Sequence, residues 1–234
     1  MLESRALKLV LASASERRRA LLTQTGLSFQ VLPARVEEFR RPGEDPAACV
    51  VRLSQEKAGE AAARSPAGSL ILAADTAVVD GSDMLGKPED SAGAARMLRR
   101  LRGRTHQVVT GLTLLDTRAD RDVSEVCQTE VSMRAYGDDE LAAYVATGDP
   151  LDKAGAYAIQ HGGFRPVAEL AGCYANVVGL PLCHFTRALR RLDVALPEGS
   201  TTLCEALPDY DQHDCPLYER LLRGKDEIEE ILRK

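Results

Sequence analysis

Residues 9–19 of the chain, LVLASASERRR, join an apolar run to two serines and three arginines. The apolar run predicts a buried strand and the polar stretch predicts a helix start, so the chain changes from strand to helix near Ser13. Unpaired backbone N–H groups and the positive end of the helix dipole meet at such a start. Serine hydroxyls and arginine guanidinium groups there can bind phosphate oxygens. A serine N-cap followed by a solvated basic helix face is the alternative, and this segment alone leaves both interpretations open.

Alternating strand and helix patterns continue outward from this segment and predict an α/β fold. Gly26 can end the first helix, and Asp45-Pro46 is typical of a second helix start, with Asp as the N-cap and Pro in the first turn. The run 69–74 is apolar throughout, which indicates a central strand buried on both faces. The predicted strands lie near 8–12, 28–32, 69–74, 105–116 and 122–135, and the predicted helices near 16–25, 45–64, 91–102, 138–147 and 179–192.

The composition argues against several classes of protein. The 234 residues are 44% hydrophobic, which is enough for a sizeable core, and they carry a formal net charge of −5. An acidic chain does not suit nonspecific binding to nucleic acid or to anionic membranes, so neither partner is expected. The six cysteines include no C-x-x-C pair, and no apolar run reaches membrane-spanning length. We therefore expect a cytoplasmic protein with reduced thiols.

Turn-forming residues cluster at 196–202 and end the alternation of strands and helices. This break predicts one α/β domain over residues 1–195 and a C-terminal extension over residues 196–234. Leu and Ile residues between 217 and 232 suit a terminal amphipathic helix, which packs either on the body or on a second copy of the chain. The acidic stretch 208–216 is typical of a solvated linker, and a metal site there is the less favoured alternative.

Charged residues near the predicted strand ends supply candidate chemistry. Asp75 follows the apolar run 69–74, and in open α/β sheets the ends of strands line the ligand cleft. Taken singly, Asp75 fits a turn or cap, and Lys57 and Lys87 fit solvated surface positions. Together with the acidic pair Glu37-Glu38, they predict a cleft that holds a divalent cation against phosphate.

Six sequence blocks occur in one order along the chain. They are 13–18 (SASERR), 74–76 (ADT), 85–88 (LGKP), 106–111 (HQVVTG), 152–160 (DKAGAYAIQ) and 176–181 (NVVGLP). In this order they resemble the Maf family of nucleoside triphosphate pyrophosphatases, and the resemblance covers about residues 8–190. It implies a mixed, twisted sheet with flanking helices in two lobes around a deep cleft, as in the inosine triphosphate pyrophosphatases. It also implies that a nucleoside triphosphate and water give the monophosphate and pyrophosphate, with Mg²⁺ or Mn²⁺ as the cofactor. Dimerisation is common for this fold, so the resemblance also leads us to expect a homodimer.

The resemblance also implies roles for single residues. Asp75 matches the family's general base, which activates a water for attack at the α-phosphorus. Glu38 matches an acidic position that binds the metal together with Asp75, and its neighbour Glu37 is the competitor for that role. The phosphate-binding positions are matched by Ser13, Arg17, Arg18, Lys57 and Lys87, and the specificity positions by Arg17, Thr76 and Gln160. Arg19 has no matched role, so we expect it on the surface.

Gln160 bears on the choice of substrate. The pattern DKAG-x-Y-x-IQ resembles the branch of the family that acts on dTTP and UTP, and modified pyrimidine triphosphates are further candidates. A Gln amide both donates and accepts, so it can pair with the N3–H and a carbonyl of uracil or thymine. A 7-methyl-GTP or other modified-nucleotide pyrophosphatase, and a nucleotide-binding regulator of septum formation with little turnover, stay open as alternatives.

Two residues depart from the family pattern near the expected base pocket. His161 stands where the family usually has Gly, and Cys173 stands where Ser or Asp is common. Either residue could shift the preference for the base without touching the phosphate chemistry. For His161 the favoured interpretation is an exposed loop residue.

Overall fold

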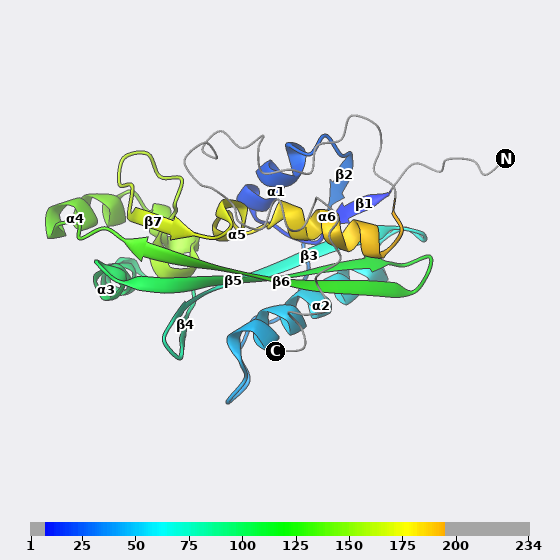
Figure 1. Cartoon of the computed structure of the whole chain (residues 1–234), viewed down its shortest axis with the longest axis horizontal. Helices are drawn as coiled ribbons and strands as arrows, with labels where there is room; N and C mark the ends of the chain where they lie inside the picture. Colours follow the sequence, from blue (N-terminus) through cyan, green and yellow to red (C-terminus); the bar gives the residue numbers. More distant parts are fainter. Residues whose placement is uncertain (1–7, 195–234) are drawn as a thin grey trace.

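The computed structural model describes residues 8–194, and within them seven strands form one mixed sheet. The strand order is β2-β1-β3-β5-β6-β7, with β4 paired to β3 (Figure 1). The first strand, β1, pairs in parallel with β2 and β3, and the other pairs are antiparallel. The strands are β1 (Leu9–Leu11), β2 (Phe29–Val31), β3 (Leu70–Asp80), β4 (Asp83–Leu85), β5 (Thr105–Asp116), β6 (Arg121–Met133) and β7 (Val167–Ala171).

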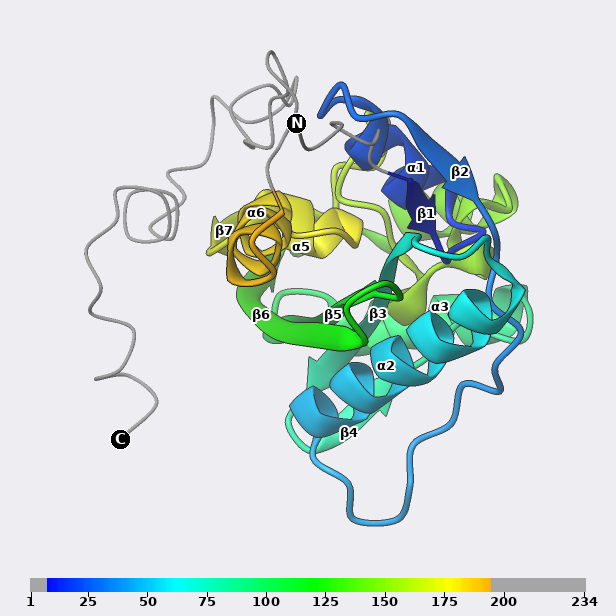
Figure 2. The same cartoon turned by 90° about the vertical axis from the view of Figure 1, so that its right-hand side faces the viewer.

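Helices cover both faces of the sheet, with α2 on one face and α5 and α6 on the other (Figure 2). The helices are α1 (Glu16–Thr23), α2 (Pro46–Arg64), α3 (Ser91–Leu101), α4 (Asp138–Ala146), α5 (Tyr174–Val178) and α6 (Leu182–Arg191), with 3-10 turns η1 (Asp149–Asp152) and η2 (Ala154–Ala156). No helix of residues 8–194 has both the length and the apolar composition that crossing a membrane requires.

The alternation of side chains along β3 assigns its residues to the two faces. Leu70, Leu72 and Ala74 belong to the apolar cluster that includes residues of α1, α5 and α6. Ile71 and Ala73 instead belong to the cluster formed with α2. The strand therefore places each successive side chain beside a different helix layer, and this order continues past the apolar run.

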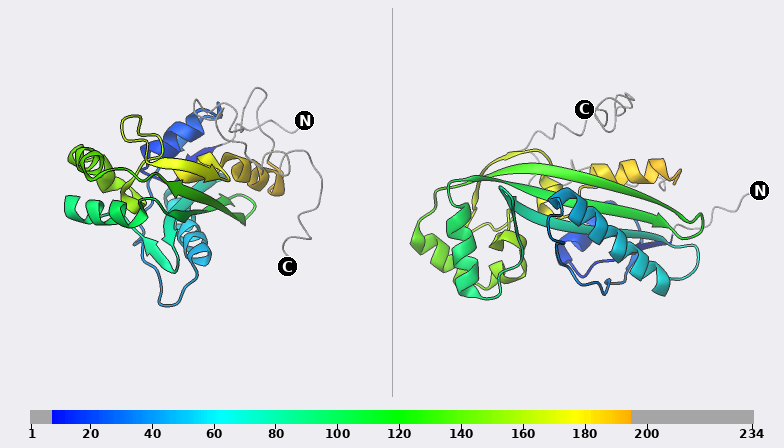
Figure 3. Two further views of the ribbon diagram at one scale, coloured as in Figure 1. Left: turned by 60° about the vertical axis from the view of Figure 1, so that its left-hand side comes forward. Right: turned by 90° about the horizontal axis from the view of Figure 1, so that it is seen from below.

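Two lobes share the long antiparallel strands β5 and β6, which run through both (Figure 3). One apolar cluster gathers side chains of α1, α5 and α6 around β1 and β3. The other gathers side chains of α3 and α4, including the buried rings of Tyr136, Tyr144 and Phe164. The expected mixed α/β sheet with flanking helices and two lobes is therefore confirmed.

Helix α2 lies close to β5 at Gly111. A Cβ atom added at this glycine would lie 2.4 Å from the carbonyl oxygen of Val50 in α2, which is far inside van der Waals contact. Glycine is therefore required here by the approach of a helix backbone to the strand. Because α2 also carries Lys57, this close contact helps to place a site residue.

Three elements differ from the expectations. Strand β7 was not expected, because it lies at the sheet edge and its residues are exposed or half-buried, so it lacks an apolar alternation. Helix α5 was not expected either, since five residues are too few for a helical period. The strand expected at 69–74 continues to Asp80, because β5 pairs with it along that length. The predicted domain boundary and terminal helix fall outside the described residues.

Candidate active site

A cavity of about 420 Å³ opens where β1 ends and β3 continues. Leu72 is the last residue of β3 that pairs with β1, and Asp75 lies three positions further along. Asp75 is thus inside β3, and the expectation that it ends its strand was wrong. It lies beyond the end of the neighbouring parallel strand, which is where α/β sheets form clefts.

All the predicted site residues within the described part of the chain line this one cavity. They are Ser13, Arg17, Arg18, Glu38, Lys57, Asp75, Thr76, Lys87 and Gln160. They come from the segment before α1, from α1 and α2, from the loop after β2, from β3, and from the segments after β4 and η2. The fold therefore gathers side chains that are up to 147 positions apart in the sequence, from Ser13 to Gln160.

Lys57 bridges two carboxylates on the α2 side of the sheet. Its Nζ lies 2.5 Å from Oδ1 of Asp75 and 2.7 Å from Oε1 of Glu38. The side chains of Lys57 and Asp75 are only 8% and 11% exposed, so this ammonium is not a surface group. Of the two acidic neighbours at 37 and 38, Glu38 lines the cavity and Glu37 does not.

The pKa of Glu38 lies below its ordinary value. Partial burial raises it, but the hydrogen bond and charge of Lys57, with the charges of Lys87 and Arg18, lower it further than burial raises it. A carboxylate in such a setting stays ionised at neutral pH. Glu38 can therefore act as an anionic ligand at the cavity wall.

Arg18 lies on the opposite face of β3, beside Thr76. Its Nη2 donates to Oγ1 of Thr76 at 3.0 Å, its Nη1 to Oγ of Ser13 at 3.3 Å, and its Nε to the carbonyl oxygen of Gly179 at 2.8 Å. Burial lowers the pKa of Arg18 while the charges of Asp75 and Glu38 oppose that change, and a guanidinium remains charged in proteins. The two faces of β3 thus present the carboxylate of Asp75 on one side and, on the other, Thr76 in contact with the guanidinium of Arg18.

The helix start predicted from residues 9–19 is present. Ser15 is the N-cap of α1 and its side chain accepts from the backbone N–H of Arg18. Oγ of Ser13 accepts from the backbone N–H of Ser15 at 3.2 Å. Arg19 is exposed and forms an ion pair with Glu16, as expected for a surface residue.

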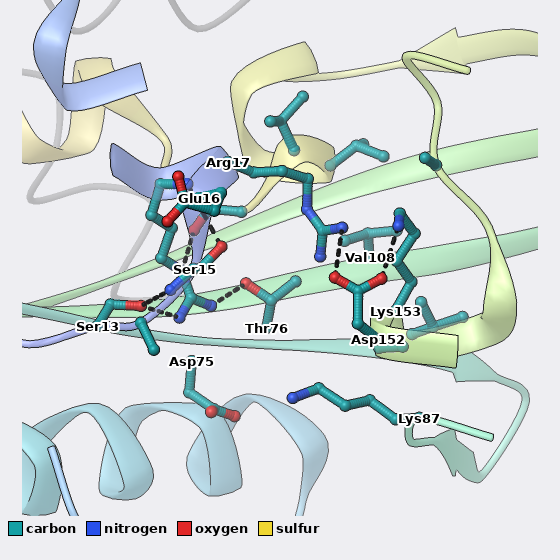
Figure 4. A pocket seen from close by; sticks show the side chains of 18 of the residues that line it. Ser13, Ser15, Glu16, Arg17, Asp75, Thr76, Lys87, Val108, Asp152 and Lys153 are labelled. Atoms are coloured by element: carbon teal, nitrogen blue, oxygen red, sulfur yellow. Dashed lines mark hydrogen bonds and ion pairs between the residues drawn. The ribbon is translucent and has the colours of Figure 1, made fainter. Parts of the chain in front are cut away.

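Arg17 and Lys87 border the cavity from two other sides (Figure 4). Nη1 of Arg17 lies 3.9 Å from Oδ2 of Asp152, and Oδ1 of the same carboxylate accepts from Lys153 at 2.6 Å. In Figure 4 the ammonium of Lys87 extends toward the carboxylate of Asp75. Cationic groups therefore face the carboxylate pair across the cavity.

Sequence reasoning assigned no role to Asp152, Lys153 or Tyr157, although all three line the cavity. They belong to the block 152–160, so the block itself was the available indication. Tyr157 is hydrogen-bonded through its hydroxyl to Nε2 of His106 at 2.8 Å. His106, which belongs to block 106–111, thus contacts the cavity wall through its hydrogen bond to Tyr157.

The two residues that depart from the family pattern do not line the cavity. His161 is half-buried, with its ring 4.7 Å from that of Tyr144 and its Nδ1 accepting from the N–H of Phe164 at 2.9 Å. His161 is therefore a loop residue, as expected, but it is half-buried and not exposed. Cys173 is buried at the start of α5, where its backbone N–H donates to Thr129.

Comparison with known proteins identifies the family. A family model described as "Maf-like protein" matches residues 8–192, which is most of the chain and contains every cavity residue. The chain belongs to the Maf family. The two-lobed fold and the cavity described above are therefore those of a Maf protein.

Relatives of this Maf protein are similar over nearly their whole length. A dTTP/UTP pyrophosphatase of Geotalea uraniireducens is 47% identical over 184 residues, covering 79% of this chain and 94% of the relative. One of Geobacter sulfurreducens is 46% identical, covering 79% and 96%. One of Anaeromyxobacter dehalogenans strain 2CP-C is 48% identical, covering 81% and 96%.

Two solved structures are more distantly similar to the Maf chain. A nucleoside-triphosphatase / dITP/XTP pyrophosphatase of Mycobacterium abscessus has a TM-score of 0.37 at 17% identity, over 56% of this chain and 76% of that one. The Ham1 protein of Staphylococcus aureus has a TM-score of 0.41 at 16% identity, over 65% and 87%. Neither likeness bears on the activity of the chain.

Proposed function

We propose that this Maf protein hydrolyses dTTP and UTP to the monophosphate and pyrophosphate. The observation that carries the proposal is the cavity in which the carboxylates of Asp75 and Glu38 face several cations, with Gln160 at its exposed edge. The names of relatives at 46–48% identity support the same activity. Modified pyrimidine triphosphates that keep the same base edge are further candidate substrates.

The donor set fits Mg²⁺ or Mn²⁺. No group of three or more His, Cys, Asp and Glu side chains suited to a metal exists within residues 8–194. Two carboxylates are nevertheless sufficient, because Mg²⁺ is commonly held by one or two carboxylates plus substrate phosphate oxygens. Asp75 and Glu38 both contact one ammonium, so their oxygens already converge on a cationic centre. A metal held by these two carboxylates and by substrate phosphate oxygens would acidify a water and neutralise phosphate charge.

Asp75 is the proposed general base. The hydrogen bond that Asp75 accepts from Lys57 holds the carboxylate in one orientation, which proton abstraction from an aligned water requires. The carboxylate is 11% exposed, so bulk solvent has little access to it. Asp75 can thus take a proton from a water aimed at the α-phosphorus.

Arginine and lysine side chains are the proposed triphosphate ligands. The guanidinium of Arg18 is fixed by three acceptors, which leaves it preorganised for phosphate oxygens next to the start of α1. Arg17 and Lys87 add positive charge at the mouth of the cavity. Charge accumulating on the leaving pyrophosphate would be stabilised by the same groups.

Pyrophosphate release from a panel of nucleotides tests the proposal. The full chain is incubated with dTTP, UTP, ATP and 7-methyl-GTP in the presence of Mg²⁺ or Mn²⁺. We expect release from dTTP and UTP, and a loss of at least about 100-fold in kcat for Asp75→Asn, since general-base catalysis contributes that much or more. Asp83→Asn is the matched control, because Asp83 on β4 pairs with Arg100 outside the cavity.

Other outcomes would contradict the proposal in distinguishable ways. Preference for 7-methyl-GTP would assign a different substrate to the same chemistry. Tight nucleotide binding without pyrophosphate release would indicate a nucleotide-binding regulator. An Asp75→Asn variant as active as the wild type would remove the proposed base.

A further inference from the structure

The segment 157–160, which we call the reader segment, carries Gln160 at the edge of the cavity. It lies between η2 and β7 and belongs to no helix or strand, and Gln160 itself is exposed. An amide that distinguishes bases by hydrogen bonding must be held in a defined place. The structure contains a group of side chains outside the proposed catalytic set that can hold it.

Tyr144 of α4 contacts the reader segment directly. Its hydroxyl accepts from the backbone N–H of Ala158 at 3.1 Å and donates to Oδ2 of Asp149 at 2.7 Å. The residue is buried and its ring stacks on that of Phe164 at a centroid distance of 4.4 Å. The hydroxyl is therefore rigidly placed, and it ties the backbone two residues before Gln160 to η1.

Lys153 donates to the carboxylate oxygen of Asp149 that Tyr144 does not contact. Its Nζ donates to the carbonyl oxygen of Asp149 at 2.6 Å, to Oδ1 of Asp149 at 2.9 Å and to Oδ1 of Asp152 at 2.6 Å. An ammonium has three protons, so these acceptors match its full donor capacity, and the side chain is only 9% exposed. Lys153 is therefore a structural tie at the cavity wall, in contrast to Lys87, which is exposed and extends into the cavity.

The same group reaches Arg17 through Asp152. Oδ2 of Asp152 lies 3.9 Å from Nη1 of Arg17, while Oδ1 accepts from Lys153. A continuous set of polar contacts thus runs from the N–H of Ala158 to the guanidinium of Arg17. It joins Arg17 to the reader segment, which carries Gln160 two residues further along the chain.

We infer that Tyr144, Asp149 and Lys153 are positioning residues that hold the reader segment and Arg17 in place for recognition of a pyrimidine base. The inference rests on the proposed function, because it assigns Gln160 to the base. None of the three residues needs to touch the substrate. Their effect is on which nucleotide binds well, while phosphate chemistry at Asp75 stays intact.

Tyr144→Phe, compared with Tyr136→Phe, tests this role. Both tyrosines are buried, both rings pack against Phe164, and each variant removes one hydroxyl. The hydroxyl of Tyr136 donates instead to the carbonyl oxygen of Leu98 in α3. For Tyr144→Phe we expect KM for UTP and dTTP to rise about tenfold with kcat little changed, the size expected for losing a buried hydrogen-bonded group.

Two further readouts separate positioning from a general loss of stability. Exchange of the Ala158 amide hydrogen should accelerate in Tyr144→Phe and stay unchanged in Tyr136→Phe. In a double-mutant cycle, the selectivity for UTP over ATP should fall in Tyr144→Phe and in Gln160→Ala, with little further loss when both changes are combined. Such coupling is expected only if Tyr144 acts through Gln160.

Several results would overturn the inference. Equal kinetics for the two tyrosine variants would do so, as would a loss confined to kcat, or losses that multiply in the double variant. If the wild type released no pyrophosphate from dTTP or UTP, the proposed function would fail, and recognition of a pyrimidine base with it. An unchanged Ala158 exchange rate would remove the structural premise whatever the substrate.

Discussion

Lys57 is the residue whose position is hardest to explain without function. It is a buried ammonium shared by Asp75 and Glu38, and removing it would leave a mostly buried carboxylate without its partner. We expect Lys57→Met to lower the free energy of unfolding by about 3 kcal/mol, as is typical when one partner of a buried pair is lost. Denaturant unfolding near neutral pH measures this change.

The paired variant provides the control for this prediction. Adding Asp75→Asn to Lys57→Met removes the unpaired charge, so most of the lost stability should return. Pyrophosphatase activity should not return, because both the proposed base and its partner are gone. A double variant that is less stable than Lys57→Met would show that the ion pair is not the cause.

His106 makes the stability of the protein depend on pH. Burial lowers its pKa to about 4, although the charge of Asp80 opposes the change. Above the ordinary value of about 6.5 the ring is neutral in both states, and below it the unfolded chain binds the proton first. Stability is therefore lost as the pH falls from about 6.5 toward 4, and we expect a loss of about 2 kcal/mol between pH 7 and pH 5 from this residue.

Unfolding of His106→Gln across the same pH range checks this expectation. The variant should lose less stability than the wild type between pH 7 and pH 5. Between pH 7 and pH 8 the two proteins should show the same dependence, because His106 is neutral there in both states. Parallel curves over the acid range would contradict the assignment.

At the level of single residues, the sequence could predict which side chains meet in the cavity but not how each is held. Asp75, Lys87 and Gln160 lie in recognisable blocks, and all of them line the cavity. Tyr144 and Asp149 lie outside those blocks, and their contacts with the reader segment depend on the packing of α4 and η1. Nor does a sequence distinguish a lysine whose protons all have acceptors from one that is available to phosphate.

At the level of elements, the packing of α2 on β5 depends on Gly111. A methyl group there would meet the carbonyl of Val50, so Gly111→Ala should lower the free energy of unfolding by about 2–3 kcal/mol through overpacking. Because α2 carries Lys57, activity should fall as well. Thermal or denaturant unfolding measures the first effect, and pyrophosphate release the second.

Gly59→Ala is the matched control on the same helix. Nothing lies within 4 Å of a Cβ added at Gly59, and this residue is inside α2, where Ala is favoured over Gly by about 0.5–1 kcal/mol. The same chemical change should therefore stabilise the protein at Gly59 and destabilise it at Gly111. Equal effects at the two positions would contradict the proposed close contact.

The elements also show where prediction from sequence stops. The long strands β5 and β6 and the capped helix α2 were predictable from their patterns, since Asp45 accepts from the first helical N–H groups as expected. The extent of β3 was not, because its second half is defined by pairing with β5. The apolar run ends at Ala74, while pairing continues to Val79.

For the whole molecule, we propose that residues 8–194 are sufficient for activity. The family match ends at residue 192, and the cavity residues all lie between Ala12 and Gly179. A chain ending at residue 194 should therefore keep kcat/KM for UTP within about twofold of the full chain, since it retains the whole family match and every residue that lines the cavity. A greater than tenfold loss would assign a catalytic or assembly role to residues 195–234.

Light scattering on the same two chains tests the expected homodimer. A dimeric full chain and a monomeric shortened chain would place the contact in the extension. Dimers in both cases would place it on the α/β body. A full chain that is monomeric at micromolar concentration would contradict the expectation.

The contact of one buried ammonium with two carboxylates also affects how the protein can be handled. Because the chain supplies its own counter-ion inside the cavity, we expect folding to proceed without a cation from solution. Protein prepared with a chelator should keep its melting temperature, lose turnover, and recover it when Mg²⁺ is added. We therefore expect that the chain can be purified and stored without turnover and then started by adding Mg²⁺, which suits time-resolved study of a single turnover.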